Sequence, residues 1–331
     1  MTLPVATAAA LPAIVQAAAD KARDYSRKSR AANTRRAYAA DWRAFAAWCA
    51  DAGLASLPAA PETVGLYLAA QADHLKVGTL GRRLVAITAA HRAAGHQLDT
   101  RHVAIRETFA GIKRRYGTAQ QGKAPAVVAE LRRMVEGQPE TLAGTRNRAI
   151  LLLGFAGAFR RSEIAGLDLA DLAFAADGLV VTLRRSKTDQ EGAGRKVGIP
   201  YGSTPTTCPV RAVRAWIEAA GLAGGALFRE IGTGGRIVAA YTAAAGRLRG
   251  ERLSDKSIAA VVKAAAKAAG LDPARYAGHS LRAGLATSAA AAGASERSIM
   301  QQTGHRSVGM VRRYIRSGQL FRENAAAVVG L

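Results

Sequence analysis

Apolar residues recur at intervals of three and four positions along most of this 331-residue chain. Between residues 35 and 52, Tyr38, Trp42, Phe45 and Trp48 follow this spacing and would share one face of a helix. Alanine is abundant and aromatic residues make up only 5% of the chain, so intrinsic propensity also favours helix. The sequence therefore predicts a mainly α-helical protein in which Trp42 and Trp48 pack in a core.

The helical pattern is interrupted by a short polar segment at residues 116–125, which contains two glycines and ends in Pro125. Such a composition is typical of a linker between domains. We expect an N-terminal extension or helix at 1–30, a helical domain at 31–117, a linker at 118–126 and a second domain at 127–331. The predicted helices cover residues 35–52 (capped by the segment 31–34), 61–68, 78–94, 102–115, 127–136, 145–159, 210–220, 254–269, 281–292, 296–303 and 319–329.

Two segments of the second domain depart from helical spacing. Residues 178–183 alternate in polarity and are rich in β-branched side chains, and residues 195–200 have a matching pattern. A polar, glycine-containing stretch separates them, which is typical of a β-hairpin. The expected fold class is therefore mainly α with a small β-hairpin or sheet.

Positive charge is spread over the whole chain. Lys and Arg number 47 against 24 Asp and Glu, for a net charge of +23, and the basic excess is 9 before residue 121 and 14 after it. A basic surface of this size predicts a polyanionic partner, most often nucleic acid. A soluble basic protein without such a partner is the alternative.

Other features exclude several classes of protein. No apolar run reaches the roughly 18 to 20 residues that span a bilayer, and residues 1–19 do not resemble a signal peptide. Cys49 and Cys208 are far apart, so we expect reduced thiols and a cytoplasmic, nucleoid-associated protein. Neither a metal-ligand cluster nor a phosphate-binding glycine loop is present in the sequence, so no metal and no cofactor are expected.

Several basic, imidazole and phenol side chains in the second domain follow one another in a particular order. Each local pattern is weak alone; a tyrosine in a basic helix is often a half-buried aromatic. In chain order the residues are Arg160 with Glu163, then Lys187 in the predicted hairpin turn, His279 and Arg282 in a His-x-x-Arg pattern, His305, and Tyr314 nine residues later.

In this order the residues resemble the tyrosine recombinase (phage integrase) family. The resemblance implies a helical core-binding domain, from about residue 33 to 117, followed by a mixed α/β catalytic domain. Ala283 stands where many members carry a second histidine, so the chain looks more like the Cre-like branch of plasmid and phage integrases than like the Xer enzymes. The family's catalytic residues match Arg160, Lys187, His279, Arg282, His305 and Tyr314, with Glu163 in support.

The resemblance also implies a role for each residue. Tyr314 would attack the scissile phosphate and form a 3′-phosphotyrosine, which preserves the bond energy and makes ATP unnecessary. Guanidinium groups suit the phosphate oxygens, which assigns charge neutralisation to Arg160 and Arg282, and His305 would donate a further hydrogen bond. Lys187 would protonate the leaving 5′-oxygen. His279 would assist deprotonation of Tyr314, because a phenol is protonated at neutral pH.

The expected partner is double-stranded DNA with inverted-repeat core sites, bound by a tetramer. The terminal segment Phe321 to Leu331 looks like the tail helix that docks on a neighbouring protomer, the alternative being packing on its own domain. Candidate amino-terminal DNA contacts are Arg35, Arg36, Lys76, Arg82 and Arg83.

Two other functions fit parts of this pattern. A type IB topoisomerase uses similar site chemistry on a single strand and needs no pairing of DNA sites. A catalytically inactive, sequence-specific DNA-binding protein would keep the scaffold alone. The complete set of six candidate catalytic residues argues against the second alternative.

Overall fold

The computed structural model describes residues 12–119, 122–184, 186, 189, 192–239, 241–242, 248–250, 252–305 and 307–318. The chain forms two compact units, one within residues 1–121 and the other within residues 122–331. Within the described residues, no helix combines the length and the apolar character needed to cross a bilayer.

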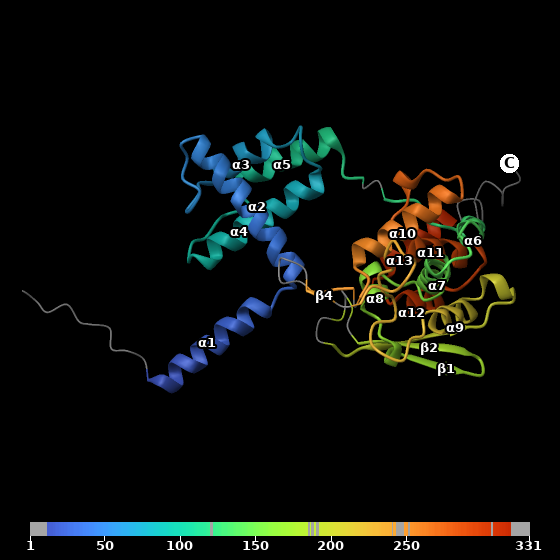
Figure 1. The fold of residues 1–331 in the computed structure, drawn as a ribbon. Helices are drawn as coiled ribbons and strands as arrows, with labels where there is room; N and C mark the ends of the chain where they lie inside the picture. The colour runs from blue at the N-terminus through green and yellow to red at the C-terminus, as the bar shows by residue number, and fades with distance from the viewer. Residues whose placement is uncertain are drawn as a thin grey trace, which may run out of the picture. The chain divides into compact units, whose positions relative to one another are not determined.

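The first unit is helical (Figure 1). Its helices are α1 (Ala13–Lys28), α2 (Ala32–Asp51), α3 (Pro61–Ala70), α4 (Val77–Ala93) and α5 (Val103–Tyr116). Phe45, Tyr67, Leu80 and Ile105 are buried where α2 to α5 pack together. Trp42 and Trp48 are partly buried and pack against this core, as the helical spacing predicted.

The predicted cap of α2 is wrong. The helix begins at Ala32, so Asn33 and Thr34 lie in its first turn, and Ala31 precedes the helix without a side-chain cap. The Asn33 side chain instead accepts a hydrogen bond from the Arg36 guanidinium. A polar side chain inside the first turn can bond along the helix surface as well as to the backbone, which is why the cap was misplaced.

The second unit combines helices with a small antiparallel sheet, which confirms the predicted fold class. Its helices are α6 (Val128–Glu136), α7 (Leu142–Ala156), α8 (Arg161–Gly166), α9 (Pro209–Ala219), α10 (Asp255–Ala268), α11 (Ser280–Ala291), α12 (Glu296–Thr303) and α13 (Val308–Gly318). Its strands are β1 (Leu172–Ala175), β2 (Gly178–Leu183) and β3 (Arg195–Pro200), with a separate short pair, β4 (Tyr241–Thr242) and β5 (Leu248–Arg249).

The predicted hairpin is present at the predicted residues. Strands β2 and β3 pair antiparallel. Leu183 lies opposite Arg195 in the last pair before the turn. β1 adds a third strand on the other side of β2. Alternate residues of β2 and β3, such as Val181 and Ile199, are buried against a helical core that includes Trp216 of α9. The sheet lies beside α9 at one edge of the unit (Figure 1).

Helix α11 connects the parts of the second unit that carry the candidate residues. It packs against α7, α12 and α13, and α10 packs against α8. The backbone N–H of Ala126 donates to the Ser280 carbonyl at 2.9 Å, and a side chain at Gly284 would collide with the Ala126 carbonyl. The start of α11 is therefore held closely against the segment that leads into α6.

Candidate active site

The turn between α7 and α8 has a strained backbone. Ala158 is buried and has φ of 49°, in the left-handed region that residues with a side chain rarely adopt. Its carbonyl accepts a hydrogen bond from Arg282 Nη1 at 2.8 Å. The bond joins the end of α7 to α11, so the strained backbone and the buried arginine hold each other in place.

Arg160 and Glu163 form a closed pair at the start of α8. Arg160 Nη1 donates to Glu163 Oε1 at 2.6 Å, and the Arg160 backbone N–H donates to Glu163 Oε2 at 2.9 Å. The Glu163 side chain is only 2% exposed. A carboxylate in the first turn of a helix is stabilised by the unpaired N–H groups there. Glu163 therefore both begins the helix and orients the Arg160 guanidinium.

Arg282 is a buried cation with an unused donor. The residue is 1% exposed, and its Nη2 has no hydrogen-bond partner within the described part of the chain. Burial, together with the nearby charge of Arg160, lowers the pKa of Arg282 to about 10, so the group stays protonated at neutral pH. A buried guanidinium with an unsatisfied N–H is suited to bind an anion.

His305 follows the carboxyl end of α12. Gly304 caps the helix in the left-handed conformation with φ of 65°, which brings the chain round to His305. The Thr303 hydroxyl donates to the Ile299 carbonyl at 2.6 Å, so its oxygen accepts from His305 Nδ1–H at 2.7 Å. In the neutral ring, Nε2 therefore carries no proton.

The charge state of His305 is set by its surroundings. The residue is 8% exposed, and burial together with the charges of Arg282 and Arg160 lowers the pKa of His305 to about 4. The ring is therefore neutral at pH 7. The sequence expectation that His305 donates to phosphate requires this ring to gain a proton or to change tautomer.

The pKa of His305 predicts that the second unit loses stability in mild acid. Because the folded pKa is about 4 and the ordinary value 6.5, the unfolded chain takes up the proton first as the pH falls. The stability is complete above about pH 6.5 and declines towards pH 4. We expect a smaller fall in melting temperature for His305→Gln than for wild type over this interval, measured by circular dichroism. Parallel curves for the two proteins would contradict the prediction.

His279 and Tyr314 form a direct pair. His279 stands just before α11, Tyr314 lies in α13, and His279 Nε2 is 2.8 Å from Tyr314 Oη. Burial raises the pKa of Tyr314, and the charges of Arg282 and Arg313 partly oppose this rise. The phenol therefore remains protonated in the free protein and can donate to an unprotonated imidazole nitrogen.

The structure thus brings together most of the residues singled out in the sequence. Their charges act on one another in a partly buried space. The assembled residues are Arg160, Glu163, His279, Arg282, His305 and Tyr314. Lys187 lies outside the described residues, as does the tail segment Phe321–Leu331.

Arg195 was missed by the sequence reasoning. It is the first residue of β3, and its charge lowers the pKa of Arg282 and of His305. Its Nη1 donates to the carbonyls of Gln301 and Gln302, both at 3.2 Å. The sequence marks Arg195 only as one basic residue among many, because nothing local indicates that the hairpin meets the end of α12.

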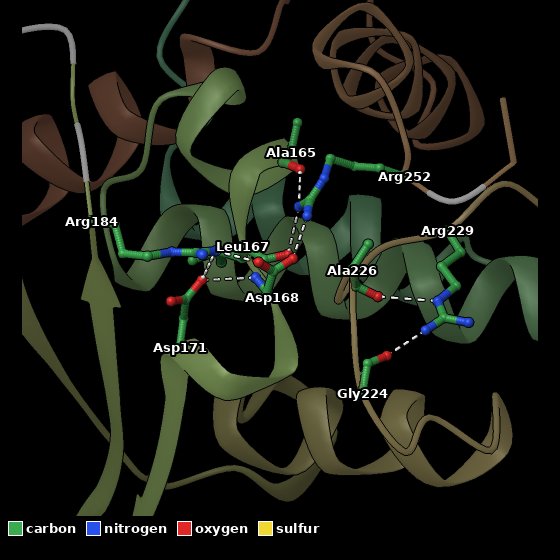
Figure 2. A network of polar contacts seen from close by, with 9 residues as sticks. All are labelled: Ala165, Leu167, Asp168, Asp171, Arg184, Gly224, Ala226, Arg229 and Arg252. Carbon is green, nitrogen blue, oxygen red and sulfur yellow. Dashed lines mark hydrogen bonds and ion pairs between the residues drawn. The ribbon is translucent and has the colours of Figure 1, made fainter. Parts of the chain in front are cut away.

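A network of ion pairs holds the β2 side of the hairpin turn, across the turn from Arg195 (Figure 2). Arg184, directly after β2, donates to the carboxylates of Asp168 and Asp171, the latter at 2.9 Å. Arg252 approaches Asp168 from a different side and also donates to the carbonyls of Ala165 and Leu167, at 3.0 and 2.9 Å. The network ties the end of β2 to the segment that follows α8.

The five candidate DNA contacts of the first unit differ in exposure and in the contacts that they make within the unit. Arg83 donates to the Tyr67 hydroxyl and to Gln71 Oε1, and its side chain is 16% exposed. Arg82 is exposed but pairs with the buried Asp41 at 2.7 Å. The side chains of Arg35, Arg36 and Lys76 are exposed.

Among the described residues of the chain, no group of three or more His, Cys, Asp or Glu side chains could hold a metal ion.

Comparisons with known proteins give consistent matches. The model of the phage integrase family matches residues 127–319. The chain is 41% identical over 309 residues to an integrase/recombinase of Selenomonas ruminantium described as a XerD homolog, covering 92% of this chain and 87% of that protein. It is 28% identical over 293 residues to the Cre recombinase of Escherichia phage P1, covering 83% and 81%.

Solved structures share the fold. The XerH site-specific recombinase in a post-cleavage complex with a palindromic difH substrate aligns with a TM-score of 0.59 at 15% identity, covering 82% of this chain and 73% of that one. A lambda integrase dimer bound to a COC′ core site aligns with a TM-score of 0.51 at 18% identity, covering 77% and 79%.

Proposed function

Because the chain belongs to the phage integrase family of tyrosine site-specific recombinases, we propose that Tyr314 is its nucleophile and that the surrounding cluster binds the scissile phosphate. The observation that carries this assignment is the 2.8 Å approach of His279 Nε2 to Tyr314 Oη. A phenol paired with a base, beside two guanidinium groups, is the arrangement that attack on a phosphodiester requires.

Cleavage is a single transesterification step. Tyr314 Oη attacks the phosphorus, the new P–Oη bond forms and the bond to the 5′-oxygen breaks. The phenolic proton passes to His279 Nε2, and the leaving 5′-oxygen takes a proton from Lys187. The product is a 3′-phosphotyrosine and a free 5′-hydroxyl. Attack by the 5′-hydroxyl of another strand reverses the step and rejoins the DNA without ATP.

The arginines stabilise the negative charge on the non-bridging oxygens of the scissile phosphate. Arg282 supplies its unused Nη2, and Arg160 is oriented for the same task by Glu163. The phosphate also offsets the positive charge that depresses the pKa of His305, so DNA binding favours a protonated ring. Nε2 then becomes a donor to a phosphate oxygen, which reconciles the neutral free ring with the expected role.

The DNA is a duplex with inverted-repeat core sites, and four protomers assemble on two such sites. In the first unit we assign phosphate contacts to Arg35, Arg36 and Lys76, whose side chains are exposed, with Arg82 as a further candidate. Arg83 contributes less, because its guanidinium already serves Tyr67 and Gln71. Affinity should fall steeply with salt, as for any site built on phosphate contacts.

An apolar cavity in the second unit is the docking site that we assign to the tail. The cavity measures about 480 Å³ and lies between α6, α7, α11 and α12, next to the end of β3. Leu131, Phe155 and Leu285 are among its lining residues. At residues 319–331, Phe321, Ala325 and Val328 recur at helical spacing, which suits an apolar groove. We assign the occupant to the tail of a neighbouring protomer.

Removal of residues 319–331 tests this docking. If the tail docks on a neighbouring protomer, the truncated chain keeps its melting temperature and its binding to one DNA site. It no longer joins two sites into a four-protomer complex, as measured by mass photometry. The cavity variant Leu285→Glu should reproduce that loss, because it places a charge among apolar residues. A lower melting temperature of the truncated free protein would instead indicate that the tail packs on its own domain.

The reaction itself is tested with supercoiled plasmids. The DNA that flanks the gene is first searched for an inverted repeat, and plasmids carrying two copies of that repeat should yield recombinant products. A plasmid without the site should stay supercoiled. Efficient relaxation of the site-free plasmid, without recombinants from the paired sites, would favour a topoisomerase and reject the proposed reaction.

A further inference from the structure

The guanidinium of Arg195 stands out because it joins the hairpin to the segment that carries His305. Resting on the function proposed above, we propose that Arg195 is a third cation of the phosphate site. One arm of its guanidinium holds the end of α12, and the other donates to the scissile phosphate. This adds a charge-bearing residue from β3 to the two arginines from α8 and α11.

The contacts of Arg195 leave one arm unused. Nη1 donates to the carbonyls of Gln301 and Gln302, which are among the last acceptors of α12. The partial negative charge at the carboxyl end of a helix stabilises a cation there. Nη2 is buried and has no hydrogen-bond partner in the described part of the chain. A buried donor without an acceptor is costly, so such groups are usually kept for a ligand.

The position of Arg195 is fixed by Gly304. A Cβ at Gly304 would lie 2.9 Å from Arg195 Cζ, so the guanidinium fits against the bare backbone of this cap. His305 is the next residue. The Arg195 guanidinium therefore packs against the turn at Gly304 that positions the His305 imidazole.

The charges around Arg195 are not balanced by carboxylates. Arg195, Arg160 and Arg282 act on one another, and Glu163 is the carboxylate that acts on both Arg195 and Arg282. Three guanidinium groups against one carboxylate leave a net local charge of about +2, even without Lys187. A phosphodiester in the site supplies the missing negative charge, and a protein carboxylate in its place would remove the attraction for DNA.

Arg184 provides a matched comparison within the same hairpin. It flanks the same turn, but its guanidinium is paired with Asp168 and Asp171. Its charge is therefore compensated before DNA binds. A loss of activity at Arg184 would act through the shape of the hairpin, whereas a loss at Arg195 would act through charge at phosphorus.

The test measures single-turnover formation of the covalent adduct by the full chain at saturating concentration. One duplex carries the ordinary scissile phosphate, and a second carries a methylphosphonate there, in which a methyl group replaces one charged oxygen. The main variant is Arg195→Gln, whose amide can still donate to the α12 carbonyls but has no charge. We expect it to lower the rate on phosphate by about 10- to 100-fold. On methylphosphonate the loss should be less than about threefold, since less charge needs neutralising.

Two further variants make the outcome decisive. Arg195→Lys keeps the charge but cannot reach the α12 carbonyls and the phosphate at once, so it should be faster than Arg195→Gln on phosphate and slower than wild type. Arg184→Gln should lose the same factor on both duplexes. Equal losses of Arg195→Gln on both duplexes, or no loss on phosphate, would overturn the inference while leaving the proposed function in place. Failure of the wild-type chain to form any adduct would reject the proposed function itself, and this inference with it.

Discussion

Replacement of Tyr314 by phenylalanine should abolish covalent protein–DNA adducts and leave DNA binding intact. The substitution removes one oxygen and the hydrogen bond to His279 Nε2, at a cost of about 1 kcal/mol in stability. The arginines that bind the phosphate are untouched. We expect affinities within about twofold of wild type in a filter-binding or anisotropy assay, since a single neutral hydroxyl contributes little beside the phosphate contacts. No slow-migrating adduct should appear on denaturing gels at any time.

The matched control is Tyr276→Phe in the same unit. The Tyr276 hydroxyl also donates to a polar group, Glu130 Oε1 at 2.8 Å, and Tyr276 is the more deeply buried of the two tyrosines. Its loss should cost stability of the same order but leave adduct formation unchanged. Adducts that persist in Tyr314→Phe would reject Tyr314 as the nucleophile. Loss of DNA binding in that variant would mean that the residue has a larger structural role than its single hydrogen bond suggests.

Replacement of Arg282 by lysine should lower the cleavage rate by about 10²- to 10³-fold with the charge retained. The Arg282 guanidinium has one donor on the Ala158 carbonyl and a second, Nη2, left for the phosphate. A lysine ammonium is a point charge on a flexible chain and cannot span both positions in this fixed geometry. The lysine variant therefore satisfies Ala158 or the phosphate, but not both at once.

The measurement is the single-turnover rate of strand cleavage at saturating protein, which separates chemistry from binding. The control is Arg133→Lys, because Arg133 of α6 also donates through Nη2 to a backbone carbonyl, that of Ala269, and is not among the charges that act on Arg282, His305 or Tyr314. That variant should cleave as wild type does. A rate for Arg282→Lys within a few fold of wild type would contradict the proposal that Arg282 bonds the Ala158 carbonyl and the phosphate at the same time.

Much of the fold could be predicted because local chemistry determines it. The β-branched alternation at residues 178–183 and 195–200 gave the strand boundaries of β2 and β3, and the helix predicted at 296–303 coincides with α12. The strand β1 was missed, since Leu172–Ala175 is only four residues long and has no β-branched side chain. Its pairing with β2 depends on a turn that the local pattern did not reveal.

The candidate site was predicted from the order of its residues, but its electrostatics could not be. The left-handed Ala158 depends on Arg282 from another element, and the lowered pKa of His305 depends on burial and on the distant charges of Arg282 and Arg160. The same holds for Arg83, whose sequence neighbours gave no sign of its internal contact with Tyr67. Non-local convergence of this kind leaves no periodic trace in a sequence.

The branch of the family stays a prediction. Ala283 favoured a Cre-like relationship, and Cre is among the similar proteins at 28% identity. The XerD homolog of Selenomonas ruminantium is more similar, at 41% identity. A single position beside Arg282 is therefore a weak marker of branch, because the chemistry at phosphorus is carried by the residues around it.

Peptide mapping of the trapped adduct tests the assignment most directly. A nicked duplex that loses its 5′-product traps the covalent complex, and nuclease and protease digestion then leaves a short nucleotide on one peptide for mass spectrometry. The chain has eight tyrosines, so the position of the added mass identifies one phenol among several. We predict a 3′-linked nucleotide on the peptide that contains Tyr314. A nucleotide on any other side chain would contradict the account.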